Sequence, residues 1–221
     1  MKKIFLLILG IALVYSCSTS TDSNGNTNTT VTDIDGNIYE TVAICNKNWT
    51  TTNLNVSKYR NGDIIPQVTD ASQWAALTTG AWCYYGNISL ISYGKLYNWY
   101  AVIDPRGLAP VGYHIPSDAE WTSLTTCLGS EAGGALKDTG TIDWTSPNTG
   151  ATNSSGFTGL PGGGRIFGGS FFYFGNGGDW WSTSEFNTTY AWGSHMDYSN
   201  VVLDRVSNFK TFGFSVRCIK D

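Results

Sequence analysis

A capped helix near the middle of the chain is the feature that most constrains the fold. Ser117 is followed three residues later by Glu120, the spacing of a capping box, in which the serine oxygen accepts a hydrogen bond from a free amide of the first turn and the glutamate accepts one from the cap amide. Gly129 supplies the left-handed residue that ends a helix of about three turns. One apolar stripe at i, i+3 and i+7 lies between them: Trp121, Leu124 and Leu128. The extended segment 109–115 therefore leads into one amphipathic helix that packs into a core.

The N-terminus has the pattern of an export signal. Two lysines at positions 2 and 3 precede an apolar run over residues 4–13. About ten residues at about 1.5 Å each cannot cross a hydrocarbon core of about 30 Å, so residues 1–16 are predicted to be a signal peptide and not a membrane span. The following Val14-Tyr15-Ser16-Cys17 resembles the bacterial lipobox, which makes Cys17 the lipidated N-terminus of the mature protein. Ordinary secretion, with Cys17 discarded or paired elsewhere, is the alternative.

Residues 18–30 have the composition of a linker. They are almost entirely Ser, Thr, Asn and Gly and contain no apolar side chain, so they cannot bury enough surface to fold. We therefore expect residues 17–30 to be a lipidated tether that holds a domain of residues 31–221 in the bacterial cell envelope. The outer membrane is the expected location, and the sequence leaves open whether the domain faces the periplasm or the cell surface.

Composition predicts one globular domain with an aromatic core. Removal of residues 1–16 leaves 11 basic against 17 acidic side chains, a net charge near −6, so a nucleic-acid partner is not expected. Residues 31–221 are long enough to bury a core. Aromatic residues make up 14% of the chain, as many as the charged ones, so burial must depend largely on Trp, Tyr and Phe.

The stretch from Gly112 to Trp121 resembles the signature of the Fibrobacter succinogenes major paralogous domain family. Further motifs fit that family in order: Val42 to Val56, Trp82-Cys83-Tyr84-Tyr85, Tyr93 to Trp99, Gly156 to Gly163, Trp180-Trp181-Ser182-Thr183-Ser184-Glu185 and Gly213 to Cys218. The resemblance covers roughly residues 31 to 221. It implies an α+β, C-type-lectin-like fold with short antiparallel strands, two or three helices and long glycine-rich loops. It also gives Trp180 and Trp181 a structural role beside the capped helix.

Other elements follow from turn and cap signals. Asp35-Gly36 predicts a hairpin between Val31–Ile34 and Ile38–Ile44, with residues 48–54 pairing back on it. The spacing of Asp33, Asp35 and Asn37 is that of a calcium loop, but the glycine comes before position six, where that loop requires it, and position twelve is Ile44, so a turn is predicted there. Two more helices are expected, one opened by a capping box at Asp70 and running through Trp74 and Leu77, the other over Tyr93–Ile103. After Ile142 we expect only short strands and glycine-rich loops.

Four cysteines besides Cys17 allow a disulfide framework. Cys45, Cys83, Cys127 and Cys218 have three possible connectivities in an oxidising compartment, and the spacing does not choose between them. Cys127 lies in the capped helix, where a buried free thiol is a reasonable alternative. A bond from Cys218 to Cys45 or Cys83 would close the domain as lectin-like folds often do.

Catalytic and metal sites are not expected. His114 lies near Asp118 and Glu120, but the capping box already uses Glu120, so a hydrogen-bonded structural histidine is favoured over a metal or acid–base site. Gly162-Gly163-Gly164-Arg165 lacks the Lys-Ser/Thr of a phosphate loop and is predicted to be a turn. The lectin-like fold includes formylglycine-generating enzymes, which need reactive cysteines in the C-terminal part, where this chain has only Cys218. We therefore expect no enzyme activity and no cofactor.

The segment from Tyr190 to Phe212 resembles a diversified binding face. Ten positions there carry residue types that arise from an asparagine AAC codon when its adenines change: Tyr190, His195, Asp197, Ser199, Val202, Asp204, Val206, Ser207, Phe209 and Phe212. Such a pattern is typical of a diversity-generating retroelement, and the mixture of aromatic and small polar side chains is typical of a paratope. A surface that has drifted and binds nothing is the alternative.

The sequence therefore predicts a non-catalytic binding module for a protein or glycan ligand. The residues expected to bind the ligand are Tyr190, Trp192, His195, Asp197, Tyr198, Ser199, Asp204, Phe209 and Phe212. An enzyme related to sulfatase-modifying factors, or a structural envelope lipoprotein without a small ligand, are the alternatives.

Overall fold

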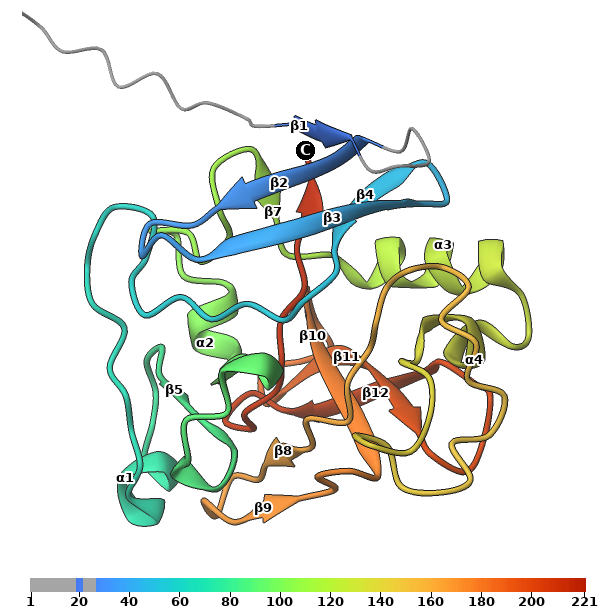
Figure 1. Cartoon of the computed structure of the whole chain (residues 1–221). Coiled ribbons are helices and arrows are strands. Elements are labelled where there is room, and N and C mark those ends of the chain that lie inside the picture. Colours follow the sequence, from blue (N-terminus) through green and yellow to red (C-terminus); the bar gives the residue numbers. More distant parts are fainter. Residues whose placement is uncertain (1–18, 22–26) are drawn as a thin grey trace, which may run out of the picture.

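A six-stranded antiparallel sheet forms one end of the molecule. The computed structural model describes the backbone of residues 19–21 and 27–221, so the predicted signal peptide and Cys17 lie outside the described residues. The strands lie in the order β1-β2-β3-β4-β13-β7, with the bounds Thr19–Thr21, Thr27–Thr32, Ile38–Ile44, Lys47–Thr50, Ile219–Lys220 and Tyr113–His114. The last strand, β13, lies between β4 and β7, so the C-terminus ends beside the N-terminal hairpin (Figure 1).

The N-terminal hairpin is confirmed, and it begins earlier than predicted. β2 and β3 pair around the turn at Asp33–Asn37, and Gly36 has a φ of 86°. Residues 27–30 were assigned to the tether but belong to β2, where the Thr29 carbonyl accepts a hydrogen bond of 2.8 Å from the Thr41 hydroxyl. Composition could not reveal this, because a polar segment can be held by backbone pairing to a neighbouring strand.

A second, three-stranded antiparallel sheet lies at the middle of the fold. It consists of β10, β11 and β12, over Gly177–Glu185, Tyr190–Asp197 and Asp204–Phe209. Two short pairs accompany it: β5 with β6, over Trp82–Cys83 and Leu96–Tyr97, and β8 with β9, over Gly164–Arg165 and Phe171–Phe172. β8 and β9 lie at the end of the molecule opposite β1 and β2 (Figure 1). The fold is α+β and rich in antiparallel strands.

The capped helix is present as predicted. α3 spans Asp118–Leu128, and its capping box is complete: Ser117 accepts from the Glu120 amide at 3.3 Å, and Glu120 accepts from the Ser117 amide at 2.9 Å. Gly129 ends the helix with a φ of 82°. Trp121 and Leu124 are buried. A short helix that the sequence did not predict, α4 over Ala132–Leu136, follows it.

The other two predicted helices are shorter than expected. α1 spans Ala71–Ala75 behind Asp70, whose side chain accepts from the Gln73 amide, so it ends before Leu77. α2 spans only Trp99–Val102, and the prediction of a helix over Tyr93–Ile103 is wrong. Its helical spacing was misleading because β6 pairs with β5, and the Asn98 side chain then starts the helix by accepting from the Ala101 and Ala81 amides.

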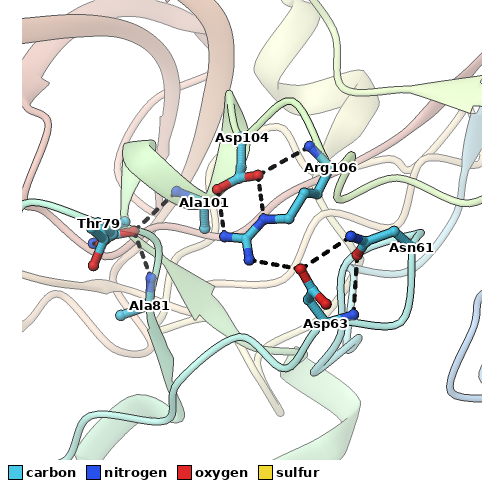
Figure 2. Close-up of polar contacts among 8 residues, drawn as sticks. Asn61, Asp63, Thr79, Ala81, Ala101, Asp104 and Arg106 are labelled. Carbon is cyan, nitrogen blue, oxygen red and sulfur yellow. Dashed lines mark hydrogen bonds and ion pairs between the residues drawn. The ribbon is translucent and has the colours of Figure 1, made fainter.

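An ion-pair network holds the loop after α2. Arg106 donates to Asp104 at 2.8 Å and to Asp63 at 3.1 Å, and its guanidinium lies 4.1 Å from the centre of the Tyr59 ring. Asn61 donates to Asp63 at 3.0 Å (Figure 2). Arg106, Asp63 and Asn61 are exposed, and solvent-exposed pairs contribute little to stability, so the network orders a surface loop.

The core is aromatic and lies on both sides of β10. Trp180 and Trp181 are fully buried neighbours, and because successive strand residues point to opposite faces, they belong to different core clusters. The ring centre of Trp180 lies 5.9 Å from that of Phe157, and the Phe157 ring centre lies 6.0 Å from that of Trp121 in α3. Trp181 lies 4.5 Å from Phe214 and donates from its indole to the Tyr97 carbonyl at 2.8 Å. β10 therefore joins both halves of the core.

Several buried basic side chains are bound by backbone carbonyls, and Arg217, Lys137 and Arg165 each bind three of them. Arg217 donates to the carbonyls of Thr50, Phe157 and Thr158, at 2.7 to 2.9 Å, and to the Asn53 side chain. Lys137 donates to the carbonyls of Thr149, Asp197 and Asn200, and Arg165 to those of Val68, Thr69 and Gly169. In the part of the chain that the structure describes, none of the three forms an ion pair with a carboxylate. Each joins loops that are far apart in the sequence.

One disulfide is present, between Cys45 and Cys127. The alternative of a free thiol at Cys127 is therefore wrong, and so is the pairing of Cys218 with Cys45 or Cys83. Cys83 and Cys218 are buried free thiols. The bond connects the turn between β3 and β4 to the last turn of α3, two segments that only the tertiary fold brings together.

Candidate ligand-binding site

A hollow of about 410 Å³ opens between the second sheet and the loops around β8 and β9. We call it the β10–β12 hollow. Its wall is mostly aromatic and aliphatic, formed by Phe172, Tyr173, Phe212, Phe214, Ile166 and Val206. Its polar side chains are Asp179, His195, Ser207 and Asn208. An apolar wall with a few convergent polar groups, at a volume of several hundred Å³, is the usual form of a small-molecule site.

A histidine–carboxylate pair forms the polar part of the β10–β12 hollow. Asp179 of β10 and His195 of β11 lie directly opposite each other in the strand register, and Nδ1 of the imidazole lies 2.9 Å from Oδ1 of the carboxylate. Gly177 allows the His195 ring to lie close to the backbone of β10, because a Cβ at position 177 would lie only 2.8 Å from Cε1 of His195. Asp179 is only 5% exposed, and its second oxygen, Oδ2, has no hydrogen-bond partner among the described residues.

The unpartnered oxygen is an unusual feature for a folded domain. Buried polar atoms are nearly always hydrogen-bonded, and a buried acceptor without a donor costs about 1–3 kcal/mol. Here the oxygen itself is buried, but Asp179 is one of the residues that line the hollow, so its carboxylate is a charged group that a ligand there would approach. This is the strongest indication of a binding site in the described part of the chain.

The pKa of His195 is raised from its usual value of 6.5. Burial opposes the charged imidazolium, but the hydrogen bond to Asp179 and the charges of Asp179, Asp197 and Asp204 outweigh it. Protonation therefore becomes easier in the folded protein than in the unfolded chain.

This shift predicts a dependence of stability on pH. Because the pKa of His195 is higher in the folded state, the pair with Asp179 stabilises the fold fully below the unfolded value of about 6.5. That contribution is lost as pH rises through the folded pKa. We expect the wild-type protein to lose free energy of unfolding relative to His195→Gln as pH is raised from about 5.5, measured by urea denaturation at several pH values. A difference that stays constant across this range would show that folding does not shift the pKa of His195.

The nine residues predicted to bind a ligand are divided among four places. His195 and Phe212 line the β10–β12 hollow, and Asp204 lies opposite His195 in the register of β11 and β12. Tyr190 stacks on Phe209 at the end of the sheet, with ring centres 4.5 Å apart. Trp192 points to the other face, where the guanidinium of Arg205 lies 3.3 Å from its ring centre.

The last three of the nine form the turn after β11. Asp197 accepts from the Ser199 amide at 2.8 Å and from its hydroxyl, so these two side chains serve the turn itself. Tyr198 packs against the core cluster that contains Trp180. The structure therefore does not bring all nine residues into one site.

Sequence reasoning missed Asp179, Phe172 and Tyr173, which precede the segment considered. A signal was present for Asp179, since a single acid stands beside two buried tryptophans in Gly177-Gly178-Asp179-Trp180-Trp181. With a strand period of two, that acid shares a face with Trp181 and so points into the molecule. Of the ten positions that resemble diversified codons, His195, Val206, Ser207 and Phe212 line the β10–β12 hollow.

The other sites considered are structural. His114 lies 2.7 Å from Asp221 and 3.1 Å from Glu120, as expected for a hydrogen-bonded histidine. Asp33 accepts from the amides of Asp35 and Asn37, as the turn interpretation expects. No cluster of three or more His, Cys, Asp or Glu side chains suited to a metal ion occurs within residues 19–21 and 27–221.

The two free thiols are poor nucleophiles. Burial raises the pKa of Cys218 to about 12 and that of Cys83 to about 11, so both stay protonated at neutral pH. Asp179 and His195 have the arrangement of a base and its orienting carboxylate. In the described residues, no hydroxyl or thiol is hydrogen-bonded to Nε2 of that histidine. None of the described helices has the length and apolar character that a membrane span requires.

Comparison with known proteins identifies the domain. The family sequence model of the Fibrobacter succinogenes major domain matches residues 42–220. This range is most of the chain and includes every strand of the second sheet. No curated protein and no solved structure matches the chain. The match includes the capped helix, the Trp180-Trp181 strand and the C-terminal strand on which the sequence resemblance rests. The chain belongs to the Fibrobacter succinogenes major domain family.

Proposed function

We propose that the protein is a non-catalytic binding module whose ligand occupies the β10–β12 hollow. The observation that carries this proposal is the open aromatic hollow itself, whose lining includes the buried carboxylate of Asp179 with one oxygen that has no hydrogen-bond donor among the described residues. A ligand that donates a hydrogen bond there would satisfy it, and the aromatic wall would bury the rest of the ligand. The ligand is a protein or a glycan, in keeping with the sequence expectation.

Binding can be tested by screening the purified full-length protein, in detergent, against glycan and peptide arrays. The matched variant is Val206→Arg, because Val206 lines the β10–β12 hollow and an arginine would fill it. We expect at least one array class to bind the wild type and to lose its signal with the variant, while circular dichroism of the two proteins stays the same. A signal that persists in Val206→Arg would place the ligand elsewhere, and no signal with any class would contradict the proposal.

The fold proposed for the domain is C-type-lectin-like, and the C-terminal segment is proposed to be diversified. Support comes from the family resemblance and from the four diversified-type positions that line the β10–β12 hollow. The gene and its neighbourhood provide the test. A near-copy of the region encoding residues 190–217, differing only where the copy has adenine and lying beside a reverse-transcriptase gene, would support diversification. Absence of such a copy would contradict the proposal that this segment is diversified.

The envelope location is proposed from the N-terminal sequence. Lipidation of Cys17 would tether the domain to the outer membrane through the polar segment that follows. Labelling of cells with a fatty-acid analogue is expected to mark the wild-type protein and not Cys17→Ser. Equal labelling of both proteins would contradict the lipid anchor.

A further inference from the structure

We infer that the β10–β12 hollow binds a protonated amine, with Asp179 as its counter-charge and the aromatic wall as its cation–π surface. This inference rests on the proposed function, because it names the ligand class of the same hollow. The amine can belong to a small molecule or to the side chain of a lysine, since both present the same ammonium group on an alkyl arm.

The charges of the hollow favour a cation. Among its lining residues the only acid is Asp179, and none is a lysine or an arginine. Two further acids, Asp197 and Asp204, are close enough to act on the charge of His195. An anionic ligand would be repelled by these groups. When His195 is neutral, a hydroxyl ligand would leave the charge of Asp179 uncompensated, whereas an ammonium group supplies both a hydrogen-bond donor and a counter-charge.

The aromatic wall also favours a cation. The ring centres of Phe172, Phe212 and Phe214 lie 5.8 to 6.3 Å from one another; Phe172 and Phe212 are half-buried, whereas Phe214 is buried. The ring centre of Tyr173 lies 6.0 Å from that of His195. Ring faces attract cations. The chain uses this contact elsewhere, as with Lys95 over Trp82 at 4.3 Å and with Arg165 over Trp74 at 4.5 Å.

The protein leaves this wall without a cation of its own. In the described part of the chain, no lysine or arginine lies over the rings of Phe172, Tyr173, Phe212 or Phe214. Apart from His195, which pairs with Asp179, the hollow therefore has no basic side chain of the described residues beside its carboxylate or its rings. A volume of about 410 Å³ accommodates an ammonium group with its alkyl arm.

His195 should make amine binding dependent on pH. When the imidazole is protonated it already neutralises Asp179, so the incoming ammonium group gains less. The charged and titratable groups that face His195 are Asp179 on β10, Asp197 on β11, Asp204 on β12 and Tyr173 beyond β9. We expect amine affinity to fall as pH is lowered through the pKa of His195, and His195→Gln to bind amines with little dependence on pH in this range.

The experiment uses NMR titration of the full-length protein in detergent micelles with four probes. Cadaverine and Nα-acetyl-lysine amide present the ammonium group as a free amine and as a lysine side chain. The Nε-acetylated form of the second probe removes the charge, and methyl glucoside represents neutral sugars. Asp179→Asn tests the carboxylate, and Asp63→Asn is the matched control, since Asp63 is an exposed acid in the loop network of Figure 2.

We expect both ammonium probes to shift resonances of the β10–β12 hollow and the two neutral probes to do so at least tenfold more weakly. Asp179→Asn should weaken ammonium binding at least tenfold, and Asp63→Asn should not change it. If Asp179→Asn does not fold, the role of the Asp179 carboxylate is tested by pH instead. Amine binding should weaken at low pH in the wild type and should not weaken in His195→Gln.

The possible failures separate the two proposals. Equal affinity of charged and neutral lysine probes, or binding of the sugar alone with loss in Val206→Arg, would overturn the amine inference and leave the binding function in place. Failure of every probe, together with silent arrays, would overturn both. A preference for the lysine probe over cadaverine would identify a protein ligand as the source of the amine.

Discussion

Replacement of Arg217 by methionine is expected to lower the free energy of unfolding by about 4 kcal/mol. Arg217 is 1% exposed, and its guanidinium donates to three backbone carbonyls and to the Asn53 side chain. Methionine fills similar space but donates no hydrogen bond, so buried acceptors at Thr50, Phe157 and Thr158 lose a donor at once. Urea denaturation followed by tryptophan fluorescence measures the change.

The matched control is the same substitution at Arg205. That side chain is half exposed and pairs with Asp118 at 2.7 Å, so Arg205→Met should cause a much smaller loss. Arg217→Lys should fall between the two, because one ammonium group cannot reach all the acceptors of a planar guanidinium. Similar losses for Arg217→Met and Arg205→Met would contradict the role assigned to Arg217.

Loss of the disulfide between Cys45 and Cys127 is expected to destabilise the domain by about 4 kcal/mol. The bond closes a loop with a sequence separation of 82 residues, and cross-linking so long a loop removes much of the entropy of the unfolded chain. The double variant Cys45→Ala/Cys127→Ala, compared with the oxidised wild type by urea denaturation, measures the effect.

Reduction provides an internal control. A reducing agent should lower the stability of the wild type toward that of the double variant and should leave the double variant unchanged. Cys83 and Cys218 are buried, so they should react with a thiol reagent only when the protein unfolds. A double variant as stable as the oxidised wild type would show that the unfolded chain is already constrained in this region.

Local signals in the sequence were sufficient for the elements that depend on neighbouring residues. The capping box of Ser117 and Glu120 defines α3, and Asp35-Gly36 defines the hairpin of β2 and β3. The helical spacing after Tyr93 failed, because pairing of β6 with β5 outweighs local preference. The disulfide could not be deduced, since three connectivities were compatible with the spacing of the cysteines.

The candidate site was predictable in part. The sequence singled out the segment of β11 and β12, and residues of that segment, such as His195 and Phe212, line the β10–β12 hollow. Asp179 of β10 and the residues around β8 and β9 could not be added, because their position beside β12 depends on the tertiary fold. Trp192 was misleading because successive side chains of a strand point to opposite faces, and Trp192 lies on the face opposite to that of His195.

Lys137 has a consequence for how freely this protein can change its sequence. Its ammonium group binds the main-chain oxygens of Asp197 and Asn200 in the turn between β11 and β12. Every amino acid brings the same carbonyl group, so this attachment does not depend on which side chains occupy the turn. Substitutions in the turn can therefore accumulate with little loss of its position. A turn held in this way tolerates changes of its side chains without losing its attachment to the core.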